Sequence, residues 1–317
     1  MKKMEISRDF FVDVKLGAVT EQVHVVQFGA GDRNFVVWHS YDSVNRFYEW
    51  RSLKMCGQVT LVGLPGHGPV QGINPEYDNR WPANHFIDVG VEVVKKLSLG
   101  TSLTLVGHST GAQVALGVAS RLPDIVDGLV LINPLVWLPV NKISRWMINS
   151  SFWPLVGSIV LRRQYHLKRR SIESYLEGIR SIVGDRESFY GNPRILGYVK
   201  GGHEDYKQTS LKTLVNTVRV LAQSDLRLLL SDRQLITPAL IVHGEVDPVC
   251  PVSQARWLHR HLPNAKLVVL PGVGHIGYGE REEEFEEVLL SWIRGKESFR
   301  PKAKKVGRKQ QRLMTDV

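Results

Sequence analysis

The sequence predicts an α/β fold with a mostly parallel central sheet, helices on both faces and an inserted helical cap. Short apolar segments such as Phe35–Trp38 are rich in β-branched residues and lack polar alternation, which is typical of strands covered on both faces. Between residues 81 and 132 such segments alternate with helical patterns, as parallel sheets require. From about residue 134 to 235 this alternation stops and only helical patterns continue.

The same patterns predict the elements of the core in order. The expected strands are Phe10–Leu16, Val23–Phe28, Phe35–Trp38, Gln58–Val62, Leu103–Val106, Leu129–Ile132, Ala239–Val242 and Lys266–Leu270. The expected helices extend from Trp81-Pro82 to Gly100, from about Ser109 to Arg121, from about Val252 to Leu262 and from about Glu280 to Ile293. Pro82 suits the first turn of its helix, where a backbone N–H has no partner to lose.

The break in the α/β pattern divides the chain into three parts. Residues 1–134 and 236–297 are predicted to form the core, and residues 135–235 the helical cap. Residues 298–317 are polar, basic and without periodicity, so we expect a disordered tail there.

The composition is that of an ordinary globular protein, with 43% hydrophobic and 23% charged residues among 317. No apolar run reaches the roughly 18 residues of a membrane span, and none follows the opening lysines as a secretory signal would. A cytoplasmic location is therefore expected. The only cysteines, Cys56 and Cys250, are far apart in the sequence, which argues against a disulfide framework and a cysteine-rich metal site.

The net charge of +10 comes from two short segments. Residues 142–170 and residues 300–312 each carry seven basic residues and no acidic one. The rest of the chain has more acidic than basic residues. The high isoelectric point therefore does not predict a nucleic-acid partner, because nucleic-acid binding needs a basic surface on the body of the domain.

A possible nucleophile lies in the segment Gly107-His108-Ser109-Thr110-Gly111, a G-x-S-x-G pattern between a predicted strand and a predicted helix. A serine on such a sharp turn has a strained backbone. Side chains two residues before and after it would collide, so both positions require glycine. The amides of the following helix favour a developing negative charge. The structural alternative is a glycine-rich turn with a capping serine.

A possible acid and base follow two later strands. Asp247 comes after the strand Ala239–Val242 and a glycine turn; Glu245 competes for its role, and a helix N-cap is the structural alternative. His275 lies in a glycine-rich loop directly after the strand Lys266–Leu270. The carboxyl ends of parallel strands line one crevice, so the order Ser109, Asp247, His275 predicts a catalytic triad.

These motifs resemble those of the α/β-hydrolase superfamily, in its capped serine-hydrolase branch of esterases, C–C hydrolases and lactonases. The resemblance extends from about residue 22 to 295 and is weakest in the cap. His39-Ser40-Tyr41 resembles the family's His-Gly-x turn, and residues 64–68 resemble its Pro-Gly-x-Gly loop. Ser40 departs from the family's glycine, which puts the geometry of the oxyanion hole in doubt.

The resemblance implies the α/β-hydrolase fold and a mechanism. His275 takes the proton of Ser109, and Asp247 holds the imidazole and stabilises its cation. The amides of Thr110 and Tyr41 would hold the oxyanion. The remaining histidines of these motifs, at positions 39, 67 and 108, are interpreted as structural.

The cap segment contains a stretch of apolar residues flanked by arginines, in which Trp146, Phe152 and Trp153 are predicted to contact the substrate. Two interpretations stay open. The basic residues form the solvated face of a packed helix, or they surround an apolar entrance suited to an anionic or amphipathic acyl substrate or a weak contact with a membrane surface. The basic tail is assigned no function.

The sequence thus predicts a serine hydrolase that cleaves a carboxylic ester or thioester of a moderately apolar small molecule. The alternatives are an acyltransferase of the same fold, a non-catalytic ligand sensor and a peripheral membrane protein. No metal cluster or nucleotide-binding loop is evident in the sequence, so no metal and no cofactor is expected.

Overall fold

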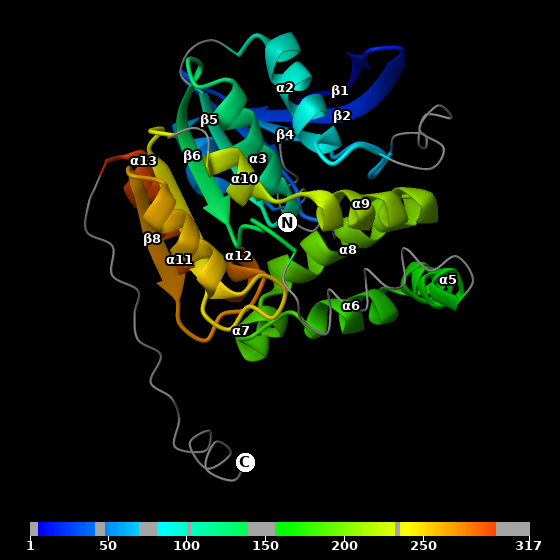
Figure 1. The fold of residues 1–317 in the computed structure, drawn as a ribbon. Helices are drawn as coiled ribbons and strands as arrows, with labels where there is room; N and C mark the ends of the chain where they lie inside the picture. Colours follow the sequence, from blue (N-terminus) through cyan, green and yellow to red (C-terminus); the bar gives the residue numbers. More distant parts are fainter. Residues whose placement is uncertain are drawn as a thin grey trace, which may run out of the picture.

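The computed structural model describes residues 6–41, 48–69, 81–99, 103–138, 156–231 and 235–295. Its centre is a sheet of eight strands in the order β1-β2-β4-β3-β5-β6-β7-β8 (Figure 1). The strands are β1 (Ile6–Leu16), β2 (Val19–Gly29), β3 (Arg33–Trp38), β4 (Gly57–Val62), β5 (Leu103–His108), β6 (Val126–Ile132), β7 (Ala239–Gly244) and β8 (Ala265–Leu270). All eight predicted strands are confirmed.

The sheet is parallel from β4 to β8. The pairs β1–β2 and β2–β4 are antiparallel, and every other neighbouring pair is parallel. The crossovers between parallel strands pass through helices, as the alternating pattern predicts. The predicted mostly parallel α/β sheet is therefore confirmed.

Helices cover both faces of the sheet, and neighbouring residues of the central strands point to opposite faces. Leu105 and Leu129 pack into one apolar cluster, with α2 (His85–Leu97), α3 (Thr110–Arg121) and α11 (Val252–His261). Val106 and Val130 pack into the other, with α1 (Arg51–Cys56) and α13 (Glu282–Ile293). Burial on both faces explains why these strands read as continuous apolar runs.

Helices also fill the described part of the chain between β6 and β7. They are α5 (Val156–Arg170), α6 (Ile172–Arg180), α7 (Arg186–Gly191), α8 (Pro193–Gln208), α9 (Leu211–Gln223) and α10 (Leu226–Ser231). Figure 1 shows α5, α6, α8 and α9 together on one side of the sheet. We call α5–α9 the cap helices. The boundaries of core, cap and tail stay predictions, and residues 298–317 lie outside the described residues.

Short polar residues set where the cap helices begin. The side chains of Ser171, Asp185, Asn192 and Ser210 each accept a backbone N–H at the start of α6, α7, α8 and α9, respectively. Such caps satisfy N–H groups that have no partner within the helix. The helix predicted from about Glu280 to Ile293 corresponds to α13, which begins at Glu282. A separate short helix, α12 (Gly277–Glu280), precedes it, and Arg281 lies between the two with a φ of −140°.

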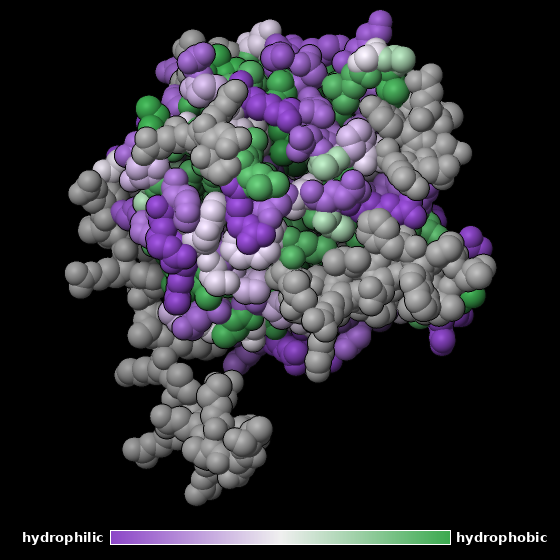
Figure 2. Space-filling view, in the orientation of Figure 1, coloured by the Kyte–Doolittle hydropathy of each residue, from purple (hydrophilic) through white to green (hydrophobic). Residues whose placement is uncertain are grey.

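The surface in Figure 2 is mostly hydrophilic, with smaller apolar areas between polar residues, as is usual when the largest apolar side chains pack inside. None of the described helices is both long enough and apolar enough to cross a membrane. The cytoplasmic location expected from the sequence stays a prediction.

Candidate active site

Ser109 lies at the turn between β5 and α3 in a strained backbone conformation. Its φ is 54° and its ψ is −112°, a region that residues other than glycine rarely adopt. The side chain is almost fully buried, and the Ser109 N–H donates to the carbonyl of Ile132 at 2.9 Å. Strain of this kind is typical of functional sites, because the surrounding structure must hold it in place.

The two glycines of the motif are required by close backbone approach. A Cβ at Gly107 would overlap the main chain of Gly111, and a Cβ at Gly111 would overlap the carbonyl of Trp38 at the end of β3. The collision that the sequence pattern implies is therefore present in the fold. Any side chain at either position would push Ser109 out of its turn.

Asp247 lies in the loop after β7, where four donors hold its carboxylate. Oδ1 accepts the backbone N–H groups of Val249 at 2.7 Å and Cys250 at 3.0 Å. Oδ2 accepts Nδ2 of Asn133 at 2.6 Å and pairs with Nδ1 of His275 at 2.7 Å. Burial alone would raise the pKa of Asp247, but the His275 and His243 rings and the hydrogen bonds from His275 and Asn133 lower it to about 2.

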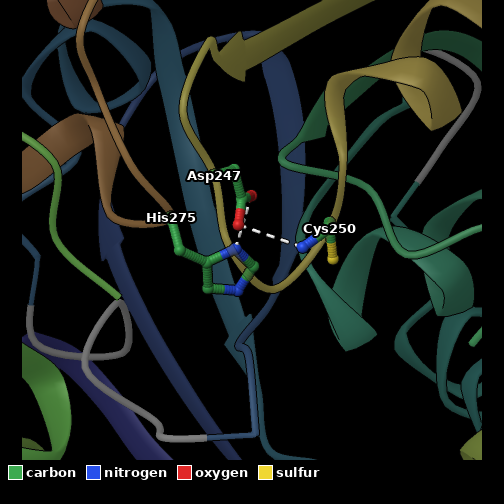
Figure 3. Close-up of side chains that lie close together, drawn as sticks. All are labelled: Asp247, Cys250 and His275. Atoms are coloured by element: carbon green, nitrogen blue, oxygen red, sulfur yellow. Dashed lines mark hydrogen bonds and ion pairs between the residues drawn. The ribbon is translucent and has the colours of Figure 1, made fainter. Parts of the chain in front are cut away.

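His275 lies in the loop after β8 and is held from both sides. Its side chain is almost fully buried, and its backbone N–H donates to the carbonyl of Ile182 in the cap at 2.8 Å. Because Nδ1 faces Asp247, Nε2 is the nitrogen left to exchange a proton with a nucleophile. Figure 3 shows the Asp247 carboxylate facing the imidazole.

The competing acid, Glu245, lies elsewhere. Its side chain is exposed, and its Oε2 accepts the N–H of Gly272 at 3.1 Å. The structure thus brings Asp247 and not Glu245 to His275. The cause is the turn after β7, which points the two residues in different directions.

Ser109 and His275 both line a cavity of about 510 Å³ between the core and the cap helices. Ser40, Tyr41 and Thr110 line the same cavity, so the two residues predicted for the oxyanion hole, Tyr41 and Thr110, share it with Ser109. The cap contributes Tyr165 of α5, Ile179 of α6, Tyr206 of α8, and leucines and valines of α9. The cavity is therefore mostly apolar, as small-molecule sites usually are. Its polar lining residues come from both sides, and those of the cap are Gln164, Lys168, Ser174, Glu177 and Ser181.

The predicted substrate contacts Trp146, Phe152 and Trp153 lie outside the described residues. A second cavity, of about 360 Å³, is lined by charged residues of α13 and its surroundings. Ser109, Asp247 and His275 do not line that cavity, so the chemistry described above belongs to the larger one.

Asn133 belongs to this site and was missed by the sequence reasoning. It follows β6 with a φ of 42°, and its Nδ2 donates both to Asp247 Oδ2 and to the carbonyl of Gly274, at 3.2 Å. It thereby fixes the acid and the loop of the base at once. Its position directly after a buried parallel strand is the one signal that could have identified it.

Cys250 is a second missed residue. Its buried thiol lies near Ser109, and burial raises the thiol pKa well above its usual range. A protonated thiol is a weak nucleophile, so Ser109 is the better candidate. Ligand atoms of Cys250, Asp247 and His275 lie within 4.8 Å of one another (Figure 3). Both Asp247 oxygens are already hydrogen-bonded, which favours a hydrogen-bonded triad over a metal site.

The histidines interpreted as structural are all buried and hydrogen-bonded to the main chain. His39 Nε2 accepts the N–H of Leu64 at 2.8 Å, which leaves Nδ1 to donate to the carbonyl of Ser40. His67 Nδ1 contacts the carbonyl of Pro65, and His108 Nε2 the carbonyl of His275. These contacts support loops around the site, in agreement with the structural interpretation.

The family model described as "Alpha/beta hydrolase family" matches residues 29–288. The chain therefore belongs to the alpha/beta hydrolase family and is classed with its hydrolases. This match confirms the resemblance found in the motifs, and it includes β3–β8 together with all three candidate triad residues.

Curated relatives of similar length include esterases and another hydrolase. A pimeloyl-[acyl-carrier protein] methyl ester esterase from Nitrosomonas europaea is 25% identical over 83% of this chain and 96% of its own length. A 2-(acetamidomethylene)succinate hydrolase from Mesorhizobium japonicum is 24% identical over 86% of this chain and 91% of its own length.

Solved structures share the fold at lower identity. A thermophilic esterase from Thermogutta terrifontis matches with a TM-score of 0.69 and 18% identity, covering 92% of this chain and 100% of that one. An enol-lactonase from Burkholderia xenovorans matches with a TM-score of 0.68 and 14% identity, over 89% of this chain and 100% of that one. These similarities confirm the predicted α/β-hydrolase fold.

Proposed function

We propose that the protein is a serine hydrolase that cleaves a carboxylic ester or thioester of a moderately apolar small molecule through an acyl-enzyme. One observation carries the proposal. Ser109 and His275 line the same apolar cavity, and Asp247 is hydrogen-bonded to Nδ1 of His275. The strained turn at Ser109 supports the same role.

The reaction proceeds in two halves. His275 Nε2 takes the proton of Ser109 as Oγ attacks the substrate carbonyl, and the backbone amides of Thr110 and Tyr41 stabilise the oxyanion by about 3 kcal/mol per donor. The protonated His275 then donates its proton to the leaving alcohol or thiol. Water, deprotonated by His275, attacks the acyl-enzyme and releases the acid. Throughout, Asp247 keeps Nδ1 protonated and stabilises the imidazolium.

The apolar wall of the cavity supports an acyl group longer than acetyl. Each methylene that leaves water for such a wall contributes about 0.8 kcal/mol. The names of the curated relatives, esterases among them, support the same reaction class.

The test is labelling with a fluorophosphonate, followed by hydrolysis of a panel of p-nitrophenyl esters. Wild-type protein should be labelled and should hydrolyse the esters, and Ser109→Ala should do neither. Cys250→Ala is the matched control, because this thiol lies beside the nucleophile. Labelling that survives in Ser109→Ala and disappears in Cys250→Ala would overturn the proposal. A wild-type protein that binds the esters but is never labelled would point to a ligand sensor instead.

A second candidate function is hydrolysis of an ester that an anionic carrier or an anionic amphiphile presents. Arg162, Arg163 and Arg170 of α5 are exposed, and none of them pairs with an acid among the described residues. Gln164, Leu167 and Lys168 of the same helix line the cavity. Opposite charge at the entrance raises the rate of encounter more than the affinity of the complex. The same arginines would support a weak contact with an anionic membrane surface.

This candidate predicts a substrate-dependent response to charge reversal. Arg162→Glu combined with Arg163→Glu should lower kcat/KM about tenfold for an ester attached to an anionic carrier, because encounter slows. Hydrolysis of a neutral p-nitrophenyl ester should stay within about twofold. Equal losses on both substrates would contradict the candidate, and vesicle flotation with anionic lipids would test the membrane contact separately.

A further inference from the structure

Glu280 is a buried carboxylate close to the site but outside the candidate triad. It is the last residue of α12, five residues after His275, and its relative exposure is 1%. A buried carboxylate is costly unless hydrogen bonds compensate it, so its partners indicate what holds it there.

The carboxylate accepts four backbone N–H groups from two distant parts of the chain. Oε2 accepts those of Gly274 at 2.9 Å, Gly184 at 2.9 Å and Asp185 at 2.7 Å. Oε1 accepts that of Ile276 at 3.2 Å. Gly274 and Ile276 are the two neighbours of His275 in the sequence. Gly184 and Asp185 lie in the cap, between α6 and α7.

Other contacts join the same two segments. The His275 N–H donates to the carbonyl of Ile182, and Arg281 Nε donates to Oδ2 of Asp185 at 2.9 Å. A Cβ at Gly184 would lie 2.7 Å from the carbonyl oxygen of Gly272 and from the nitrogen of Gly274. The backbones thus touch directly. We call this arrangement the Glu280 clamp: residues 182–185 of the cap, residues 274–276 of the core, and Glu280 between them.

The clamp also reaches the cavity. The side chain of Ile182 lines the cavity, while its carbonyl holds the backbone of His275. A ligand that displaces Ile182 therefore acts on the segment that positions the base. The hydrogen bonds of the Asp247 carboxylate, by contrast, come from its own loop, from Asn133 and from His275.

We propose that Glu280 is a positioning residue that couples the cap to the catalytic base, so that the placement of the cap sets the alignment of His275. The proposal rests on the proposed function for its kinetic consequences only. The clamp needs two acceptor oxygens at residue 280, because all four of its hydrogen-bond partners are backbone N–H donors. In Glu280→Gln the amide NH2 would face a backbone N–H, and at least one bond would be lost.

The kinetic test compares two buried glutamates, Glu280 and Glu286. Glu280→Gln should lower kcat for a p-nitrophenyl ester about 10- to 100-fold, because misplacing a catalytic group by about 1 Å costs that much. KM should stay within about twofold, since the cavity wall is otherwise intact. Glu286→Gln is the control: the Glu286 carboxylate accepts the hydroxyl of Tyr48 and, at 2.7 Å, the N–H of Ser52, and neither residue belongs to the clamp. Equal kcat in both variants would overturn the proposal.

A second readout does not depend on activity. Hydrogen exchange followed by mass spectrometry should show faster exchange in residues 182–185 and 274–276 together in Glu280→Gln, and in neither segment in Glu286→Gln. Faster exchange in one segment alone would overturn the coupling. If the wild-type protein hydrolyses no ester, the proposed function fails, and this exchange experiment still decides the clamp.

A substitution on the cap side tests the direction of the coupling. Gly184→Ala places a methyl group against the backbone of the His275 loop and should lower kcat about tenfold or more, although residue 184 is remote from the nucleophile. Gly191→Ala, at the end of α7, is the matched control because nothing lies within 4 Å of its Cβ. A Gly184→Ala protein that is folded and as active as Gly191→Ala would contradict the proposal.

Discussion

The two walls of the cavity are built in different ways. In the core wall, Ser109 and Asn133 have positive φ, two glycines allow close backbone contact, and four donors fix Asp247. The cap wall is made mainly of tyrosines and aliphatic side chains from helices α5, α6, α8 and α9, together with a few polar residues such as Gln164, Lys168 and Glu177. Directed hydrogen bonds fix atoms to within tenths of an ångström, whereas apolar packing mainly fixes volume. From this difference we expect the chemistry to depend on the core wall and the choice of substrate to depend on the cap wall.

The largest effect should come from the acid of the core wall. Asp247→Asn should lower kcat/KM about 10⁴-fold, because the amide cannot hold the correct tautomer of His275. Glu245→Gln should stay within about twofold of wild type, since the Glu245 side chain is exposed and accepts a hydrogen bond from the N–H of Gly272. The measurement is steady-state hydrolysis of one ester by the two variants. The reverse ranking would assign the acid to Glu245.

The carboxylate of Asp247 should make the stability of the protein fall at acidic pH. The folded pKa of Asp247 is about 2, below the value of about 3.9 expected in the unfolded chain. Its contribution to stability is therefore complete above about pH 5 and is lost as the pH falls towards 2. Urea unfolding should show wild type losing about 2–3 kcal/mol relative to Asp247→Asn over that interval. Parallel pH profiles for the two proteins would contradict the low pKa.

A smaller, selective effect should come from the cap wall. Activity should rise from acetyl to about hexanoyl esters, because each buried methylene contributes about 0.8 kcal/mol. Val215 of α9 lines the cavity and is half-buried, so Val215→Phe should reduce hexanoyl hydrolysis about tenfold and leave acetyl hydrolysis within about twofold. Trp153→Ala should also flatten the profile. Wild-type activity that does not change with the length of the acyl chain would contradict the role assigned to the cap wall.

The residues of the core wall could be predicted from the sequence because short segments of the chain determine them. Gly107 and Gly111 are dictated by the turn itself, and Asp247 and His275 each follow a strand whose apolar pattern is clear. Strand ends in a parallel sheet meet at one edge, so the order of the residues was enough to place them together. Cap positions give no such signal, because many apolar side chains can fill the same volume.

Asn133 and Glu280 show what the sequence pattern leaves out. Each acts by joining segments that are more than 90 residues apart in the chain, Asn133 to Asp247 and Glu280 to Gly184. Neither residue type is unusual at its position, and each matters only through partners that the fold brings close.

The most direct test of the central claim is to locate the covalent adduct. The protein would be treated with a fluorophosphonate, digested, and the modified peptide sequenced by mass spectrometry. Our account predicts one adduct, on Ser109, that forms in Cys250→Ala as fast as in wild type and much more slowly in Asp247→Asn. An adduct on any other residue, or equal rates in wild type and Asp247→Asn, would contradict the assignment of Ser109, His275 and Asp247 as a catalytic triad.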